Sequence, residues 1–157
     1  MYNKVLVPLD RSELAECTLA HVKNLAQNDS VGEVILLNAV PMEIPFDDIP
    51  RDDIDVGRGF DFRAFWKEKL DEAGKYLANA QTKLTEGGIK AGTVVIEGTK
   101  PAPAITDFAA KNGVDLIVLA THGYTGMKGM FLGSVAFQVL HESPVPVLLI
   151  RPEVCRL

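Results

Sequence analysis

The chain has 157 residues, of which 47% are hydrophobic, 24% charged and 7% aromatic. These proportions are those of a globular protein, and the length fits one domain, 1–157, with a core of its own. The net charge of −5 argues against nucleic-acid binding, which depends on clustered Lys and Arg. No apolar run is long enough to span a bilayer. The first residues lack the pattern of a signal peptide, so we expect a cytoplasmic protein.

Five short runs rich in Val, Ile and Leu predict strands, at 4–8, 33–40, 93–97, 115–120 and 146–150. These runs are mostly continuous rather than alternating. Continuous apolar runs are typical of strands that are buried on both faces of a parallel sheet.

Helical patterns separate the strands, at about 12–27, 62–85, 103–112 and 133–142. The second is the most regular, because apolar residues recur every three or four positions from Phe62 to Leu84. Strict alternation of strand and helix predicts an α/β fold: a single-domain, five-stranded, doubly wound parallel sheet with helices on both faces and right-handed crossovers.

The one long connection is 41–61, which contains three prolines and many aspartates. We expect it to be a long acidic loop. The aspartates do not follow the spacing of an EF-hand, and the prolines interrupt them, so a solvated loop is favoured over a cation site.

The thiol and imidazole groups do not suggest a metal centre. His21, His122 and His141 are scattered along the chain. Cys17 and Cys155 are far apart in the sequence, and we expect free thiols rather than a bridge.

The segments that follow the strands are where a ligand is expected. In open parallel sheets, ligands bind at the carboxyl ends of the strands, where the winding reverses direction. The first strand is followed by Asp10, and the fourth by a glycine-rich segment that leads into the last helix at Gly133-Ser134. A helix N-terminus offers free N–H groups to a phosphate. Neither a P-loop nor a G-x-G-x-x-G fingerprint is present, so the glycines could also be only a connection.

The stretch 115–151, DLIVLATHGYTGMKGMFLGSVAFQVLHESPVPVLLIR, resembles the C-terminal signature of the universal stress protein family. The opening KVLVPLDRSE and the regions EVILLNAV and GTKPAPAITDFAAKNGVDLIV are also similar to the family. The resemblance covers the chain except 41–61. It implies a Rossmann-like fold of the adenine nucleotide alpha hydrolase type, a dimer, and ATP (or ADP or AMP) as ligand, together with Mg²⁺ or Mn²⁺.

ATP-binding members of that family carry G-x-x-G, nine residues, and then G-[ST]. Here the motif reads Ala120-Thr121-His122-Gly123, nine residues, and then Gly133-Ser134. The resemblance implies that the nucleotide is held by Pro8, Asp10, Val40, Ala120, Thr121, His122, Gly123, Gly133, Ser134 and Val135. Within this set it implies that Asp10 and Val40 lie around the adenine, Pro8 and Gly123 near the ribose, and 133–135 at the phosphates.

Ala120 departs from the family motif. If its backbone has a negative φ and only its N–H is used, alanine costs little. If the position requires a positive φ or contact with the ribose, ATP binding is weakened.

Several of these residues also have structural explanations. Asp10 could cap the first helix and form a capping box with Glu13, and Ser134 could be the N-cap of the last helix. His122 could be a hydrogen-bonding spacer rather than a catalytic group, because no nucleophile and carboxylate stand out beside it.

Three functions follow from these observations. The first is a dimeric, ATP-binding regulatory module of the stress response, with a homodimer formed through the last strand, about 146–151. The second is a slow ATPase. The third is a nucleotide-free interaction module of the same family, which Ala120 keeps open. We favour the first, with no catalytic residues assigned.

Overall fold

The computed structural model describes residues 1–27, 30–42, 61–121 and 133–151. Its strands are Tyr2–Pro8 (β1), Val31–Val40 (β2), Ala91–Glu97 (β3), Leu116–Ala120 (β4) and Val147–Ile150 (β5). Its helices are Glu13–Leu25 (α1), Phe62–Thr85 (α2), Pro101–Lys111 (α3) and Ser134–Glu142 (α4). The chain therefore alternates strand and helix throughout the described residues, as the sequence predicts.

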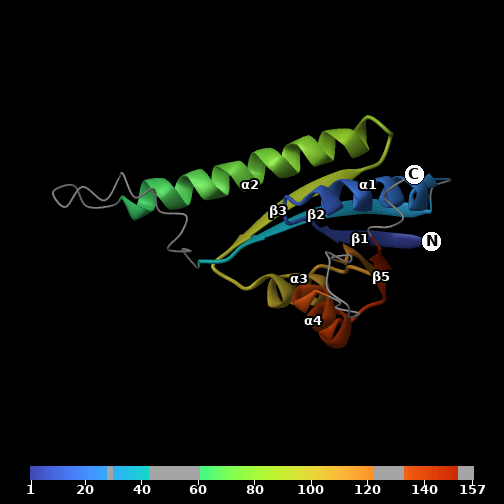
Figure 1. The fold of residues 1–157 in the computed structure, drawn as a ribbon. Coiled ribbons are helices and arrows are strands. Elements are labelled where there is room, and N and C mark those ends of the chain that lie inside the picture. The colour runs from blue at the N-terminus through green and yellow to red at the C-terminus, as the bar shows by residue number, and fades with distance from the viewer. Residues whose placement is uncertain (28–29, 43–60, 122–132, 152–157) are drawn as a thin grey trace.

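The five strands form one sheet in the order β3-β2-β1-β4-β5, and all neighbouring pairs are parallel. The chain winds outward from β1 through β2 to β3 and then returns to the other side of β1 for β4 and β5. The winding thus reverses between β1 and β4. Figure 1 shows α1 and α2 on one face of the sheet and α3 and α4 on the other, which confirms the predicted doubly wound α/β fold.

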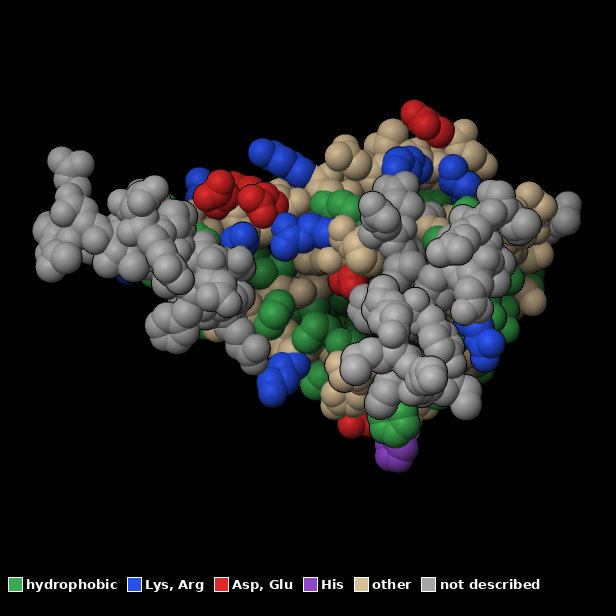
Figure 2. Space-filling model, viewed as in Figure 1, with side chains coloured by type: hydrophobic (Ala, Val, Ile, Leu, Met, Phe, Trp, Pro, Cys, Tyr) green, Lys and Arg blue, Asp and Glu red, His purple; other side chains and the backbone are tan. Residues whose placement is uncertain are grey.

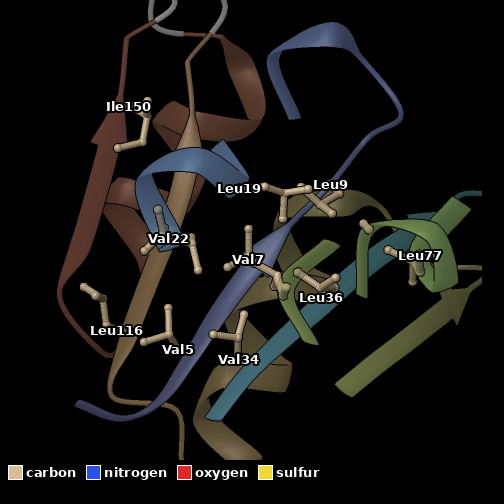
Figure 3. Close-up of a cluster of buried hydrophobic side chains, with 13 residues drawn as sticks. Val5, Val7, Leu9, Leu19, Val22, Val34, Leu36, Leu77, Leu116 and Ile150 are labelled. Atoms are coloured by element: carbon tan, nitrogen blue, oxygen red, sulfur yellow. The ribbon is translucent and has the colours of Figure 1, made fainter. Parts of the chain in front are cut away.

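The sheet separates two hydrophobic cores, because successive side chains of a strand point to opposite faces. Val5 and Val7 belong to the cluster that also contains residues of α1 and α2, whereas Leu6 belongs to the cluster that contains residues of α3 and α4. All three side chains are fully buried. Figure 3 shows the first cluster, to which α1 contributes Leu19 and Val22 and β1 contributes Val5 and Val7. Burial on both faces explains why β1 reads as a continuous apolar run.

Neither Asp10 nor Ser134 is the helix cap that the sequence suggested as an alternative role. Asp10 does not cap α1, because the N-cap residue is Ser12. Ser134 is the first residue of α4, and the N-cap is Gly133. The N-cap of α1 thus lies two residues after Asp10, and the N-cap of α4 lies one residue before Ser134.

The expectation of a free thiol at Cys17 is wrong. Cys17 lies on α1, half-buried against the core, and is disulfide-bonded. Distance along the sequence does not limit how closely two thiols approach after folding. The acidic stretch 43–60 also lies outside the described residues. Within the described residues, every helix is too short or too polar to cross a membrane.

Candidate nucleotide site

A cavity of about 240 Å³ opens at the carboxyl ends of β1, β2 and β4, where the winding reverses. It lies on the face of the sheet that carries α3 and α4. The residues that line it are Pro8, Leu9, Asp10, Ser12, Leu37, Ala39, Pro101, Ile105, Leu119, Ala120, Gly133, Ser134, Val135 and Ala136. In Figure 2, hydrophobic side chains gather in the middle of the viewed face, while charged side chains lie above them along α2. The carboxyl ends of the strands at the reversal of the winding are where doubly wound sheets commonly bind ligands, and the cavity lies there.

One end of the cavity is apolar. Leu37, Ile105 and Leu119 belong to the core between the sheet and α3 and α4, and each is almost fully buried. Ala39 and Pro101, which are half-buried, add to this apolar lining. These apolar side chains make no hydrogen bonds to water, so a flat apolar or aromatic group can pack against them without breaking any.

The turn after β1 brings a carboxylate to the cavity. Asp10 is exposed, and its Oδ1 accepts a hydrogen bond from the Ser12 backbone N–H at 3.0 Å. Asp10 is the only ionisable residue among those that line the cavity within the described chain. The turn thus supplies an acceptor at the rim but no cation.

The start of α4 supplies donors instead. The first helical hydrogen bond runs from the Phe137 N–H to the Gly133 carbonyl at 2.9 Å. The N–H groups of Ser134, Val135 and Ala136 therefore have no acceptor within the helix. Within the described residues, no side chain caps this end, and all three residues line the cavity. Free N–H groups and the positive end of the helix dipole together form a favourable environment for a phosphate.

The structure brings together most of the site residues that the sequence predicts. Asp10 and Pro8 from β1 and its turn, Ala120 at the end of β4, and 133–135 at the start of α4 all line the cavity. Val40 and Thr121 are buried beside the cavity rather than in its wall. Their backbone groups are used elsewhere: the Val40 carbonyl accepts from the Gly98 N–H, and the Thr121 N–H donates to the Ile150 carbonyl. His122 and Gly123 lie outside the described residues.

The sequence reasoning missed the contribution of α3. Pro101 and Ile105 line the cavity, yet neither belongs to a motif that signals a ligand. The available signal was topological, because the helix that follows β3 covers the same face as α4. Leu37 and Ala39 were also missed, although they flank Asn38 near the end of a predicted strand.

The described part of the wall offers two hydroxyl groups and one carboxylate. Ser12 and Ser134 are the hydroxyl groups in the described wall, and Asp10 is the carboxylate. Among the described wall residues, Asp10 accepts from the Ser12 backbone N–H and not from a serine hydroxyl. Nucleophilic catalysis needs a base within hydrogen-bonding reach of the nucleophile.

Comparison with known proteins identifies the family of the chain. The profile of the universal stress protein family matches residues 1–151. The chain belongs to the universal stress protein family. Universal stress protein MJ0577 of Methanocaldococcus jannaschii is 35% identical, and the alignment covers 96% of each chain. Universal stress protein YxiE of Bacillus subtilis is 33% identical, with coverage of 96% of this chain and all of the relative.

Solved structures share the fold. The structure of MJ0577 superposes with a TM-score of 0.74 at 34% identity and covers 96% of both chains. A universal stress protein from Archaeoglobus fulgidus, solved in complex with dAMP, has a TM-score of 0.66 at 23% identity, and 95% of this chain and 98% of that one are covered. At that identity the likeness shows the common fold.

Proposed function

We propose that this universal stress protein binds an adenine nucleotide (ATP, ADP or AMP) in the cavity between β1, β4 and α4. It acts as a nucleotide-dependent regulatory module. The observation that carries the proposal is the pairing of an apolar wall with free helix N–H groups in one cavity at the reversal of the sheet. A nucleotide has two matching parts: a flat base that can pack against the apolar wall, and anionic phosphates that can accept from the N–H groups.

In this arrangement the adenine lies against the apolar wall formed by Leu37, Ile105 and Leu119. The phosphates lie at the backbone N–H groups of 134–136, which no helical acceptor uses. Asp10 at the rim can accept a hydrogen bond from an amino group of the base or from a ribose hydroxyl. The complex of the Archaeoglobus fulgidus protein with dAMP supports the choice of an adenine nucleotide for this fold.

The volume of the cavity limits what is enclosed. About 240 Å³ is below the range of about 300–1,000 Å³ that is common for ligand pockets. The base and sugar would occupy the cavity, and a triphosphate would extend along the start of α4 toward solvent. Among the described residues, no group of three or more His, Cys, Asp or Glu could hold a metal ion. We therefore expect Mg²⁺ or Mn²⁺ to be bound mainly by the phosphates.

Thermal unfolding of nucleotide-stripped protein, with and without millimolar Mg-ATP, tests this proposal. Ligand at a hundred times Kd stabilises the folded state by about 2.7 kcal/mol, so the midpoint of wild type should rise. Gly133→Val, which crowds the phosphate site, should abolish the rise. Gly74→Val is the matched control, because Gly74 lies on α2 and a Cβ there meets no atom within 4 Å. It should keep the full rise.

Direct titrations separate the two halves of the site. AMP should bind more tightly than adenosine if the start of α4 holds phosphate, and ATP should bind more tightly than GTP if the wall selects the base. Absence of both a thermal shift and a binding heat for every adenine nucleotide with wild type contradicts the proposal.

We also propose that the protein forms a homodimer through β5. This strand is the outer strand next to β4, and Leu148 on it is 39% exposed. Phe137 and Leu140 of the adjacent helix α4 are exposed as well, at 61% and 48%. An exposed apolar edge favours pairing with a second chain, and a two-fold axis lets the same strand of each subunit pair with the other.

A further inference from the structure

Asn38 lies in β2 among apolar residues and is nearly inaccessible, with 4% of its surface exposed. Leaving a buried amide without partners is unfavourable, so such a residue is retained only where it makes a specific hydrogen bond. Its Nδ2 donates to the backbone carbonyl of Leu9. Leu9 is the residue between the end of β1 and Asp10.

Both backbone groups of Leu9 are thus bound to β2. Its N–H donates to the Leu37 carbonyl at 2.8 Å, and its carbonyl accepts from Asn38. Because side chains alternate along a strand, the side chain of Asn38 points to the opposite face from those of Leu37 and Ala39. Asn38 does not line the cavity. Its side-chain amide acts on the site through Leu9, the residue that begins the β1–α1 turn.

The turn needs to be held in place. Arg11 has a φ of +66°, the left-handed conformation, and it is the only non-glycine residue with a positive φ among the described residues. Such strained residues persist where surrounding contacts over-determine the backbone, and they are concentrated at functional sites. On one side of Arg11, two residues earlier, Leu9 is hydrogen-bonded to Asn38 of β2. On the other side, the Ser12 backbone N–H donates to the Asp10 carboxylate.

We propose that Asn38 is a positioning residue of the nucleotide site: by fixing Leu9 it holds the strained turn that places the Asp10 carboxylate at the rim of the cavity. The inference rests on the proposed function. It adds a residue that touches no ligand and that acts on affinity through Asp10.

A double-mutant cycle on ATP affinity tests this role. Asn38→Leu keeps the approximate shape but removes the donor, and it should weaken binding about tenfold, because the turn is then no longer held in place before the ligand binds. Asp10→Ala should weaken binding in the wild-type background. In the Asn38→Leu background it should add less than about twofold, because Asp10 is no longer placed.

The matched control is Gln81→Leu. Gln81 also donates a side-chain amide to a strand carbonyl, that of Ala91 at 2.7 Å, but this bond lies at the start of β3, the opposite end of the sheet from the cavity. Gln81→Leu should lower stability and leave ATP affinity unchanged. If Asn38→Leu does not fold, Asn38→Ser replaces it, because the serine hydroxyl ends short of the Leu9 carbonyl.

Two results would overturn the inference: wild-type affinity in the Asn38 variant, or additive losses in the cycle. If wild type binds no adenine nucleotide, the proposed function fails, and amide hydrogen exchange of free protein then decides the positioning role. The Leu9 N–H should exchange about tenfold faster in Asn38→Leu than in wild type or Gln81→Leu. Equal exchange rates in the three proteins would show that Asn38 does not hold the turn.

Discussion

The Nη1 atom of Arg11 lies 3.1 Å from Oε2 of Glu72, and this ion pair joins the β1–α1 turn to the middle of α2. Both side chains are well exposed, at 39% and 46%, so solvent screens their attraction. The pair therefore contributes about 0–1 kcal/mol to folding. The left-handed backbone of Arg11 costs more, about 1–2 kcal/mol for an L-residue. The conformation of the turn, rather than the charge, dominates the energetics of this position.

This balance predicts how substitutions at Arg11 affect stability. Arg11→Gly removes the strain but loses the ion pair and adds freedom to the unfolded chain, worth about 0.4–1 kcal/mol, so the free energy of unfolding should stay within about 1 kcal/mol of wild type. Arg11→Val places a β-branched side chain at positive φ and should lose about 1–3 kcal/mol. Urea unfolding measures both.

Glu72→Gln is the control that isolates the charge. It should lose less than about 1 kcal/mol, and the loss should shrink at high salt. If Arg11→Gly were as unstable as Arg11→Val, backbone strain at Arg11 would not be the controlling term.

Ala120 occupies the first glycine position of the family motif without strain. It is the last residue of β4 and does not have a positive φ, so alanine is compatible with the backbone. We expect Ala120→Gly to lower the free energy of unfolding by about 0.5–1 kcal/mol and to change ATP affinity by less than about tenfold. Ala120→Val adds two methyl groups to the cavity wall and should weaken binding more than about tenfold. Calorimetric titration of both variants checks this. A large gain of affinity in Ala120→Gly would show that the family glycine is required for contact with the ligand.

Asp115 fastens the amino-terminal end of the sheet, away from the cavity. Its carboxylate accepts hydrogen bonds from the backbone N–H groups of Asn3, at 2.7 Å, and Lys4, at 3.0 Å, and from the Asn3 side chain. Burial raises the pKa of Asp115, but these hydrogen bonds outweigh it and hold the pKa below its ordinary value of 3.8. The ionised carboxylate thus links the start of β4 to the start of β1.

A lowered pKa in the folded state gives a defined pH dependence. The stabilisation is fully present above pH 3.8 and is lost as the pH falls below that value, because the unfolded chain takes up the proton first. Asp115→Asn should lose about 1 kcal/mol at neutral pH, a low value because water screens this partly exposed group. The gap to wild type should narrow as the pH falls below 3.8.

Asp107→Asn is the matched control, since Asp107 is an exposed aspartate on α3. It should follow wild type at every pH. A gap between Asp115→Asn and wild type that stayed constant down to low pH would mean that the hydrogen bonds do not depend on the ionised carboxylate. ATP affinity should be unaffected in both variants.

The order and type of the elements could be predicted because their periodicities are strong. The range of α2 agrees with the sequence pattern at both ends, since apolar positions repeat along its whole length. Strand starts were less accurate: β2 begins at Val31, before the apolar run, and includes Gly32. A Cβ at Gly32 would lie 2.7 Å from the Asn3 carbonyl, so the glycine serves the close approach of β1. Such contacts between strands leave no local pattern.

In the site, too, residues in local patterns could be predicted, and residues placed by contacts between distant segments could not. Asp10 and 133–135 could be predicted because they follow strands and belong to a motif, and they do line the cavity. Pro101 and Ile105 could not, because they reach the cavity through the packing of α3 against the sheet. Asn38 is a single polar residue within an apolar run and belongs to no motif. Its role depends on a hydrogen bond to Leu9, 29 residues away in the sequence.

The proposed dimer gives a prediction at the edge of the sheet. Leu148→Lys places a positive charge on β5, and a two-fold axis would bring the same charge of the second subunit close to it. We expect wild type to sediment as a dimer and Leu148→Lys as a folded monomer. Thr93→Lys is the matched control, because Thr93 is exposed on β3, the other outer strand. It should remain dimeric. Dissociation of both variants would mean that the interface is not specific to β5, and a wild-type monomer at every concentration would contradict the dimer itself.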